Sequence, residues 1–332
     1  MTTDENYIRY LAVAVASICY NTKYFCQFYI LADRVSDFRK HQVMDLQSRF
    51  DNFDIQWIDL NDQHRDYIIK TYISRSKNAV YTKNIANYAR FLMPDMLPNV
   101  KRALYMDSDL IVYGDIADLY NMDLGKYVLG AVADSLVFSD ENTHNKLLKY
   151  ISPNHLYFNA GILLINCEQW RKQKIFGKIA ESDAQIRDIK LFNSQDPINK
   201  CFENNYMWLP HKYNWFAKFE HFAHLSPDIK KYLADNINDD NICIRHFPGV
   251  KPDACPQEYS ISQVADLYFF AKMTDFYEEI KLVSQVHNTP TNTRPPQTNS
   301  YRVRLFGFIP LFRVNDNKVY LFNFLRILKI IK

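Results

Sequence analysis

Glycine is scarce in this chain, with only 7 among 332 residues. Neither the Gly-x-Gly-x-x-Gly pattern of dinucleotide-binding turns nor the Gly-x-x-x-x-Gly-Lys-Ser/Thr pattern of phosphate-binding loops occurs. Both patterns use glycine so that the backbone can approach phosphate groups closely. If a nucleotide binds here, we therefore expect a metal ion, rather than a glycine loop, to hold its phosphates.

Paired cysteines and long apolar runs are also absent. The six cysteines include no Cys-x-x-Cys pair, which favours reduced core thiols in a cytosolic protein over a zinc site or a disulfide framework. The first residues are acidic, and the apolar run from Leu11 to Cys19 is too short to cross a bilayer. We expect neither a signal peptide nor a transmembrane helix. The net charge of +3 is too small to indicate nucleic-acid binding.

The composition is that of a globular protein, with 48% hydrophobic and 23% charged residues. Strand-like apolar runs alternate with helical patterns along the chain. The expected strands are 25–31, 53–60, the run around 103–112, 127–133 and 160–165. The expected helices are 7–20, 38–50, 85–93 and 170–180. This alternation predicts an α/β layer fold with a mostly parallel sheet, whose ligands lie beyond the carboxyl ends of the strands.

The start of the chain does not fit this scheme fully. An α/β fold of this kind normally opens with a strand, yet a helical pattern, with Thr3 or Asp4 placed to cap it, begins within a few residues of Met1. We therefore expect the first strand to be missing. We also expect the helix at 85–93 to end before Pro94.

Two carboxylates stand between two apolar runs in Ala103-Leu104-Tyr105-Met106-Asp107-Ser108-Asp109-Leu110-Ile111-Val112. Residues i and i+2 of an extended chain point to the same side, so Asp107 and Asp109 can present their oxygens together. Oxygen ligands at a strand end suit Mg²⁺ or Mn²⁺ holding a diphosphate. An Asp-x-Asp by itself is more often a solvated turn, so the interpretation depends on other segments.

Three further segments place polar side chains at the ends of apolar runs. They are Tyr157-Phe158-Asn159-Ala160-Gly161, Asn193-Ser194-Gln195-Asp196-Pro197 and Arg245-His246-Phe247-Pro248-Gly249-Val250-Lys251. With the Asp-Ser-Asp segment, these motifs over residues 2–253 resemble glycosyltransferase family 8, the retaining, metal-dependent enzymes of GT-A fold. The resemblance is greatest to the bacterial branch that builds lipopolysaccharide and lipooligosaccharide outer cores.

The resemblance implies a donor site for a UDP-hexose. Asp4, Asn6 and Tyr7 match the nucleotide-binding start of the family, and Arg90 matches an arginine beside the donor diphosphate. The resemblance also implies the Mn²⁺ (or Mg²⁺) ligands, which are Asp107, Asp109 and His246.

Around the transferred sugar, the resemblance implies catalytic roles for Asp134, Gln195 and Asp196, and a binding role for Asn159. Gly249 and Lys251 match the segment in which a lysine neutralises the leaving phosphate. Negative charge that builds on departing UDP would be offset by the metal ion, by Arg90 and by Lys251. The residues leave open whether retention proceeds through a covalent intermediate or by same-face attack.

Three departures from the family pattern concern the site. The usual Asp-Gln-Asp reads Ser194-Gln195-Asp196, so one carboxylate is replaced by a hydroxyl. The segment from His246 to Lys251 is one residue shorter than usual, and Asp253 stands where tryptophan is common. A second metal-like group, His221 and His224 with Glu220 and Asp228, fits a surface helix better than a metal site.

The chain divides by composition into a catalytic domain (1–282), a Thr-, Asn- and Pro-rich linker (283–300) and a basic, aromatic tail (301–332). In the tail, Leu305–Val314 is echoed by Leu321–Ile330. Such a tail suits an anionic membrane surface, and the alternative is a pair of strands packed on the domain or on a second subunit. We favour the membrane slightly.

Together these features predict a cytoplasmic hexosyltransferase, peripheral on the inner membrane, that transfers glucose or galactose to a surface glycan or glycolipid. The alternatives are a non-catalytic sugar- or membrane-binding relative and a metal-dependent nucleotidyl or phosphoryl enzyme. The intact set Asp107, Asp109 and His246 argues against the first, and the Tyr-Phe-Asn-Ala-Gly segment argues against the second.

Overall fold

The computed structural model describes residues 1–73, 85–216, 227, 229–231, 241–287, 300–305, 309–315 and 318–321. The strands are β1 (Thr2–Asp4), β2 (Cys26–Asp33), β3 (Phe53–Asp59), β4 (Arg102–Met106), β5 (Leu110–Val112), β6 (Leu129–Ala133), β7 (Phe158–Asn166), β8 (Met207–Trp208), β9 (Ile244–His246), β10 (Ser300–Leu305), β11 (Ile309–Asn315) and β12 (Lys318–Leu321).

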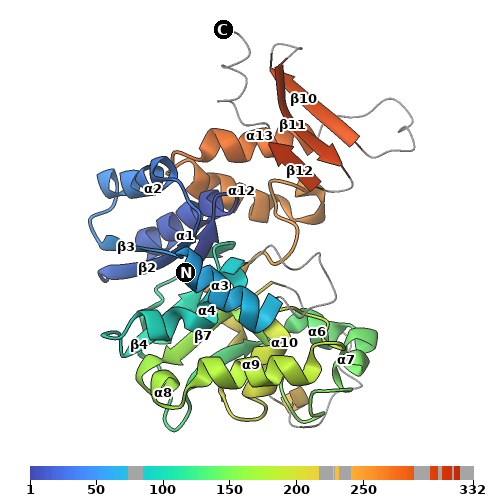
Figure 1. Ribbon diagram of the computed structural model, residues 1–332. Coiled ribbons are helices and arrows are strands. Elements are labelled where there is room, and N and C mark those ends of the chain that lie inside the picture. The colour runs from blue at the N-terminus through green and yellow to red at the C-terminus, as the bar shows by residue number, and fades with distance from the viewer. Residues whose placement is uncertain are drawn as a thin grey trace.

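Helices alternate with the strands over most of the chain (Figure 1). They are α1 (Ile8–Asn21), α2 (Asp37–Met44), α3 (Asp62–Ile68), α4 (Ile85–Met96), α5 (Ala117–Asn121), α6 (Ser135–Ser139), α7 (Glu141–Leu147), α8 (Cys167–Lys172), α9 (Ile175–Ile186), α10 (Gln195–Cys201), α12 (Ile261–Ala271) and α13 (Tyr277–His287). Short helical turns are η1 (Asp45–Ser48), η2 (Ile69–Ile73), η4 (His211–Tyr213) and η6 (Pro256–Glu258).

The strands form two main sheets. The first has the order β1-β2-β3 and is parallel throughout. The second has the order β4-β7-β6-β8; β7 runs antiparallel to β4 and β6, while β8 runs parallel to β6. A short antiparallel pair, β5 and β9, follows the Asp-Ser-Asp segment. The α/β class is therefore confirmed; the parallel pairing lies mainly in the first sheet, and the second sheet is mixed.

A strand is present at the start of the chain, where none was expected from the sequence. Thr2–Asp4 pair with Leu31–Asp33 of β2 in parallel register. The expectation that Thr3 or Asp4 caps the first helix is wrong, because α1 begins at Ile8 and its N-cap residue Tyr7 makes no side-chain cap. Asp4 instead closes the preceding turn, where its Oδ1 accepts hydrogen bonds from the backbone N–H groups of Asn6 and Tyr7, both at 2.9 Å.

Helix α4 continues past the point where the sequence predicted its end. Pro94 lies inside the helix, which runs on to Met96. The guanidinium of Arg171, in α8, donates to the carbonyl oxygens of Pro94 (2.8 Å), Leu97 (3.0 Å) and Val100 (3.0 Å). A cation that binds the last carbonyls of a helix satisfies acceptors with no partner inside the helix. This contact, 77 residues away in sequence, stabilises the extra turn.

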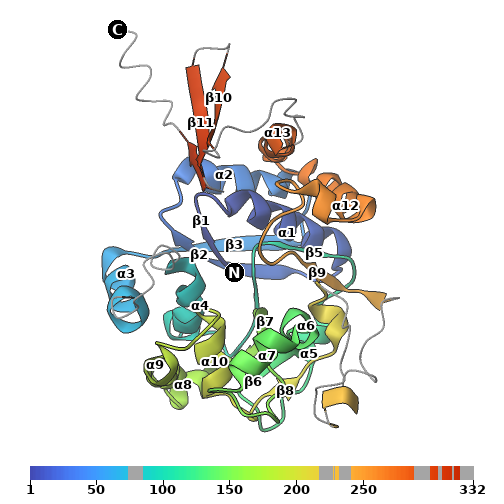
Figure 2. The same ribbon diagram turned by 90° about the vertical axis from the view of Figure 1, so that its right-hand side faces the viewer.

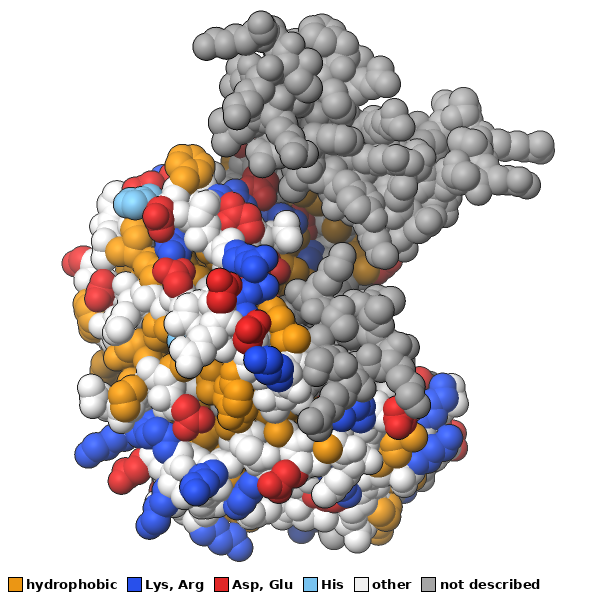
Figure 3. Space-filling model, viewed as in Figure 1, with side chains coloured by type: hydrophobic (Ala, Val, Ile, Leu, Met, Phe, Trp, Pro, Cys, Tyr) orange, Lys and Arg blue, Asp and Glu red, His pale blue; other side chains and the backbone are white. Residues whose placement is uncertain are grey.

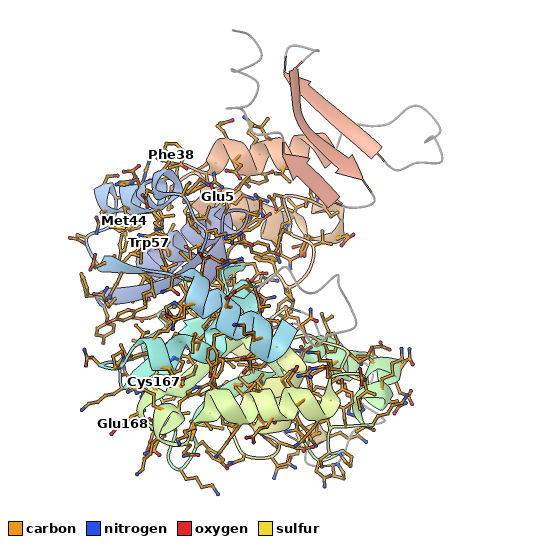
Figure 4. The ribbon with its side chains drawn as sticks, in the orientation of Figure 1. Glu5, Phe38, Met44, Trp57, Cys167 and Glu168 are labelled. Carbon is orange, nitrogen blue, oxygen red and sulfur yellow. The ribbon has the colours of Figure 1, made fainter. Side chains whose placement is uncertain are left out.

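The core consists of three clusters of buried apolar side chains. One surrounds α1 and the first sheet, the second surrounds α4, β7 and Trp170, and the third lies under α6 and α7. In Figure 4, Met44 and Trp57, which both pack against the first cluster, are labelled between α2 and β3. Figure 2 shows the first sheet with α1 and α2 in one half of the molecule, and β6, β7 and β8 with α8, α9 and α10 in the other.

The predicted linker and tail are partly described. Helix α13 extends to His287, so the first five residues of the predicted linker are helical, and residues 288–299 lie outside the described ranges. Strands β10, β11 and β12 form an antiparallel sheet, so strand pairing exists in the tail. The second copy of the predicted repeat lies mostly outside the described residues. Within the part of the chain that the structure describes, every helix is too short or too polar to span a bilayer.

Candidate active site

A cleft of about 440 Å³ opens beyond the carboxyl ends of β1 and β4. Most of the residues that the sequence analysis assigned to the site line this cleft. They are Asp4, Tyr7, Arg90, Asp107, Asp109, Asn159, Gln195, His246, Gly249 and Lys251. Asn6, Asp134 and Asp196 are not among the lining residues.

Asp107 and Asp109 occupy the short connection between β4 and β5. The backbone N–H of Asp107 donates to Gly161 in β7 at 2.8 Å, and the carbonyl of Asp109 accepts from Phe247 at 2.9 Å. These bonds fix the connection from two sides. Leu110 pairs with His246 across β5 and β9, which brings the imidazole to the two carboxylates.

The ligand atoms of Asp107, Asp109 and His246 all lie within 4.8 Å of one another. His246 Nε2 is 3.2 Å from Asp109 Oδ1 and 3.8 Å from Asp107 Oδ2. Two carboxylates and one imidazole suit Mn²⁺ and related divalent cations. These residues would hold the metal and leave its other positions to ligand oxygens. The donor set therefore fits a divalent cation.

Asn214, a residue that the sequence analysis did not identify, orients the imidazole. It is fully buried, and its Oδ1 lies 2.9 Å from His246 Nδ1. An amide oxygen can only accept, so Nδ1 donates in this contact, and Nε2 is the ring nitrogen that faces the two carboxylates. The Asn214 amide nitrogen in turn donates to Asn159 Oδ1 at 3.0 Å. Its only sequence signal is an Asn at the end of an apolar segment, which is too common to identify it.

Gly161 provides the space in which this arrangement forms. A Cβ atom at this position would lie 2.4 Å from His246 Cε1, 2.9 Å from Asn159 Oδ1 and 3.0 Å from Asp107 Oδ2. Any side chain would therefore displace at least one of the three residues. Glycine here permits the close approach of strand β7 to the ligand atoms.

Arg90 is a buried cation that faces the first carboxylate. Its NH2 lies 3.2 Å from Asp107 Oδ1, and its NH1 donates to the carbonyl of Ala160 at 2.6 Å. Its guanidinium also lies 4.9 Å from the ring centre of Tyr105, whose hydroxyl donates to Asp107 Oδ1 at 2.7 Å. Arg90 comes from α4 and is held by contacts with Tyr105 of β4 and with Asp107. Its positive charge is therefore fixed in place before any ligand binds.

Lys251 is the second cation of the cleft. Its ammonium donates to Asp109 Oδ2 and, at 2.7 Å, to the carbonyl of Phe247. Burial by itself would raise the pKa of Asp109, but Lys251 and His246 outweigh it and hold that pKa below its usual range. The carboxylate is therefore ionised at neutral pH. The short spacing from His246 does not prevent the lysine from reaching the site.

The sugar-side residues form a second hydrogen-bonded group. Gln195 Nε2 donates to Asp134 Oδ2 at 2.8 Å, and its Oε1 accepts from Asn159 Nδ2 and from the backbone N–H of Ala160, both at 3.1 Å. Asp134 caps α6 through the backbone N–H groups of Leu136 and Val137. Asp134 thus positions Gln195 and Asn159 from behind the cleft wall.

Asp196 is directed into the core. It is fully buried, and its oxygens accept from the hydroxyls of Tyr150 and Tyr157 and from the backbone N–H groups of Leu191 and Phe192. Its carboxylate contacts the core and does not line the cleft, and its predicted catalytic role stays a prediction. Its contacts hold the segment 191–194, which lines the cleft and contains Ser194.

Two further predictions concern Asn6 and the alternative metal group. Asn6 is exposed, and its backbone N–H bonds to Asp4, but it does not line the cleft. The alternative metal group formed by His221, His224, Glu220 and Asp228 lies outside the described residues.

The fold and the cleft define an α/β protein with a candidate metal site at its strand ends, flanked by two fixed cations. Residues 1–252 match glycosyl transferase family 8. The chain therefore belongs to that family, as the motif resemblance indicated.

Curated relatives and solved structures extend this result. The glycosyltransferase GlyB of Streptococcus pneumoniae serotype 4 is 28% identical over 256 residues, which cover 75% of this chain and 55% of that protein. The lipopolysaccharide 1,2-glucosyltransferase of Escherichia coli is 27% identical over 256 residues, covering 74% of this chain and 70% of that protein. The chain spans 55%, 62% and 44% of the lengths of the first three curated relatives that it matches.

Two solved structures of LgtC share the fold. An active-site mutant of LgtC superposes with a TM-score of 0.69 at 23% identity, covering 82% of this chain and 95% of LgtC. The galactosyltransferase LgtC in complex with donor and acceptor sugar analogues gives a TM-score of 0.61 at 23% identity, covering 88% and 96%. At this level of identity, the likeness establishes the fold.

Proposed function

We propose that this protein is a retaining, metal-dependent glycosyltransferase that transfers a hexose, glucose or galactose, from a UDP-sugar to a bacterial surface glycan such as the lipopolysaccharide outer core. The observation that carries the proposal is the convergence of Asp107, Asp109 and His246 in one cleft with two fixed cations. This arrangement suits a diphosphate that becomes more negative during the reaction.

The reaction needs charge stabilisation more than proton transfer at the leaving group. The bond from the sugar C1 to the phosphate oxygen breaks, and its electron pair goes to UDP; the acceptor oxygen bonds C1 as it gives up its proton. Mn²⁺ (or Mg²⁺), when bound, supplies Lewis-acid stabilisation of the diphosphate. Arg90 and Lys251 add positive charge next to Asp107 and Asp109 respectively.

Gln195 and Asn159 would orient the transferred sugar. Both line the cleft, and their mutual hydrogen bond and the contact with Asp134 hold them rigidly. The Gln195 carbonyl oxygen already accepts two hydrogen bonds, so it would act as a positioned dipole facing an oxocarbenium-like centre. On the nucleotide side, Asp4 and Tyr7 line the opposite end of the cleft.

The acceptor and the cellular location rest on other observations. The glucosyltransferase relative from Escherichia coli carries lipopolysaccharide in its name, and the LgtC complex holds donor and acceptor sugar analogues. The basic, aromatic tail supports attachment to the cytoplasmic face of the inner membrane, next to a lipid-linked acceptor. Protein that lacks residues 301–332 should then sediment less with anionic vesicles than the full chain; equal sedimentation would overturn the membrane proposal.

The first test is UDP release from a panel of UDP-sugars, with and without Mn²⁺, for the wild type and Asp109→Asn. Asparagine keeps an acceptor for Lys251 but loses the charge that a divalent cation requires. We expect Mn²⁺-dependent release from one donor and a loss of about 10³-fold in the variant. Asp37→Asn, a carboxylate that is 87% exposed, is the matched control and should be unchanged.

The same assay separates the competing functions. Silence with every donor, together with retained UDP binding, would favour the non-catalytic relative. Metal-dependent release from a nucleoside triphosphate but from no UDP-sugar would favour a nucleotidyl or phosphoryl enzyme.

A further inference from the structure

Helix α13 follows the segment that matches the family, which ends at residue 252. It lies next to α1 and α2 in both ribbon views (Figures 1 and 2). In Figure 3, basic and acidic side chains lie side by side on the upper part of the molecule, at the level where Figure 1 places α1 and α2. One acid of α13, Glu279, connects this helix to both of the others.

Glu279 holds two arginines with one carboxylate. Its Oε1 accepts from Arg9 NH1 in α1 and from Arg39 NH2 in α2, both at 3.2 Å, and its Oε2 accepts from Arg39 NH1. The side chains of Arg9 and Arg39 are 18% and 16% exposed, so water screens their charges only in part. Two guanidinium groups that approach one point repel each other unless an anion lies between them. Glu279 supplies that anion.

Both arginines also hold the turn that leads from β1 into α1. Arg9 NH1 donates to the carbonyl of Asn6 at 3.0 Å, and Arg39 NH2 donates to the carbonyl of Glu5 at 3.4 Å. The carboxylate of Glu5 accepts from the N–H and the hydroxyl of Ser36, which caps α2. The turn is therefore fixed to α1 and α2 through its backbone carbonyls as well as through a side chain.

This turn forms part of the wall of the candidate active site. Asp4 and Tyr7, which flank the two held carbonyls, line the cleft. Arg9, Arg39 and Glu279 are not among the lining residues. The three charged side chains thus support the cleft wall from behind and leave Asp4 and Tyr7 to face a ligand.

Arg9 extends the same network to the segment that carries Lys251. Its NH2 donates to the Tyr10 hydroxyl at 3.1 Å, and that hydroxyl donates to Asp253 Oδ1 at 2.9 Å. Asp253 is fully buried, and its Oδ2 lies 4.0 Å from Arg9 Nε. Lys251, two residues before it, lines the cleft. Two parts of the cleft wall are therefore connected through Arg9.

We propose that Glu279 is a positioning residue for the nucleotide end of the cleft. Through Arg9 and Arg39, it holds the turn at residues 4–7 in the geometry that binds UDP. This role rests on the proposed function, in which UDP binds at that end of the cleft. Without the charge of Glu279, the two guanidinium groups would separate and release the carbonyls of the turn. The affinity for UDP would then fall, although Glu279 itself does not touch the ligand.

The test compares Glu279→Gln with Glu278→Gln in the full chain. Glutamine retains the size of the side chain and removes its charge. Glu278 is the matched control, because its side chain is 74% exposed and pairs with Lys281 of the same helix at 3.7 Å. We expect the Kd for UDP with Mn²⁺, measured by isothermal titration calorimetry, to rise about 10-fold in Glu279→Gln. It should stay unchanged in Glu278→Gln, and both variants should retain the affinity for Mn²⁺ alone.

Two further measurements separate positioning from a general loss of stability. With the donor that the wild type uses, the KM of Glu279→Gln should rise about 10-fold while kcat changes little, because the same contact is lost in the ground state and in the transition state. Arg39→Gln should also weaken UDP binding. In the double variant the two losses should not multiply, because both changes remove the same contact.

The outcomes distinguish this proposal from the proposed reaction. Equal UDP affinity in Glu279→Gln and Glu278→Gln would overturn the positioning role. Equal losses of UDP and Mn²⁺ affinity in Glu279→Gln would also overturn it, because they would show that the whole site had weakened. If the wild type binds UDP but transfers no sugar, the proposed reaction fails, and a selective loss of UDP affinity in Glu279→Gln still supports the positioning role. A wild type that binds no UDP would overturn both.

Discussion

Two pairs of carboxylates in this molecule have the same chemistry and different surroundings. Asp107 and Asp109 line the cleft, where their oxygens converge with an imidazole. Asp134 and Asp196 are buried behind the cleft wall, and burial raises the pKa of both. The oxygens of the buried pair accept hydrogen bonds from α6, from Gln195 and Asn159, and from two tyrosines.

The comparison shows that access to the cleft, rather than residue type, separates carboxylates that can bind a ligand from carboxylates that support the fold. Helix α10 makes the distinction within two residues. Gln195 lies at its start and lines the cleft, while Asp196 and Asn199, three positions apart, lie on its buried side. Substitutions around Asp107 and Asp109 should therefore change ligand binding. Substitutions around Asp134 and Asp196 should change the stability of the fold.

The largest effect that would sharpen this comparison is expected for Gly161→Ala. The new methyl group would overlap His246 and crowd Asp107, so the metal ligands could not converge. We expect the affinity for Mn²⁺, measured by electron paramagnetic resonance of the free ion, to fall by about 100-fold. Gly177→Ala is the matched control, because nothing lies within 4 Å of its Cβ position, and Ala is favoured inside α9. Unchanged Mn²⁺ binding in Gly161→Ala would contradict the proposed ligand set.

A smaller effect on the same side is expected for Asn214→Leu. This change removes the acceptor for His246 Nδ1 and frees the imidazole to change its tautomer and orientation. Loss of a partner that orients a metal ligand typically costs 10- to 100-fold in affinity, and we expect about 10-fold here. Asn214→Asp retains the acceptor for His246 Nδ1 but loses the donor to Asn159 Oδ1, so it should bind Mn²⁺ more tightly than Asn214→Leu and less tightly than the wild type. Equal losses in both variants would mean that Asn214 acts through packing alone.

On the buried side of the comparison, Asp196→Asn should weaken the fold. An amide has one acceptor oxygen, whereas the carboxylate receives bonds from two hydroxyls and two backbone N–H groups. We expect the free energy of unfolding to fall by about 2 kcal/mol in urea titrations, with Mn²⁺ affinity retained. A loss of turnover without any loss of stability would instead return Asp196 to the chemistry.

The last prediction concerns pH and the buried His155. Its Nε2 lies 2.9 Å from Asn199 Oδ1, and its Nδ1 accepts from the N–H of Asn204 at 3.1 Å, which requires a neutral ring. Burial lowers the pKa of His155 to about 4. The unfolded chain thus binds a proton between about pH 6.5 and 4 that the folded chain excludes. Stability should be full above this window and fall by about 1.4 kcal/mol per pH unit within it.

The variant His155→Gln isolates this effect from other titrating groups. Glutamine offers a donor and an acceptor but does not titrate in this range. The difference in unfolding free energy between the two proteins should therefore shrink as the pH falls from 6.5 to 4. A constant difference would show that His155 is protonated in the folded protein.

The order of elements was largely accessible from the sequence, because apolar periodicity reports which face of a helix or strand is buried. Strand β3, predicted at 53–60, is found at Phe53–Asp59. The end of α4 was predicted wrongly because Arg171, which binds its last carbonyls, comes from a distant helix. The short first strand was taken as missing, since its three residues have a pattern only when paired with β2.

For the candidate site, the motifs identified Asp107, Asp109 and His246 together, and the structure brings their ligand atoms within 4.8 Å. The residue types in both motifs, and the close spacing of the two aspartates, are features that the chemistry of a metal site requires, so the sequence shows them directly. No such signal marks Asn214 or the role of Gly161, because each acts through a contact with a residue far away in the chain. Nor does any signal show that Asp196 faces the core while Gln195, its neighbour, faces the cleft.

The sequence by itself determined the α/β class, the family and the side chains available for metal and phosphate, because these depend on local pattern and residue type. Tertiary structure decided which oxygens remain free for a ligand. That choice depends on which groups from other elements reach each oxygen. Both oxygens of Asp196 accept hydrogen bonds from the core, whereas at Asp107 Tyr105 and Arg90 reach Oδ1, and Oδ2 faces His246 in the cleft.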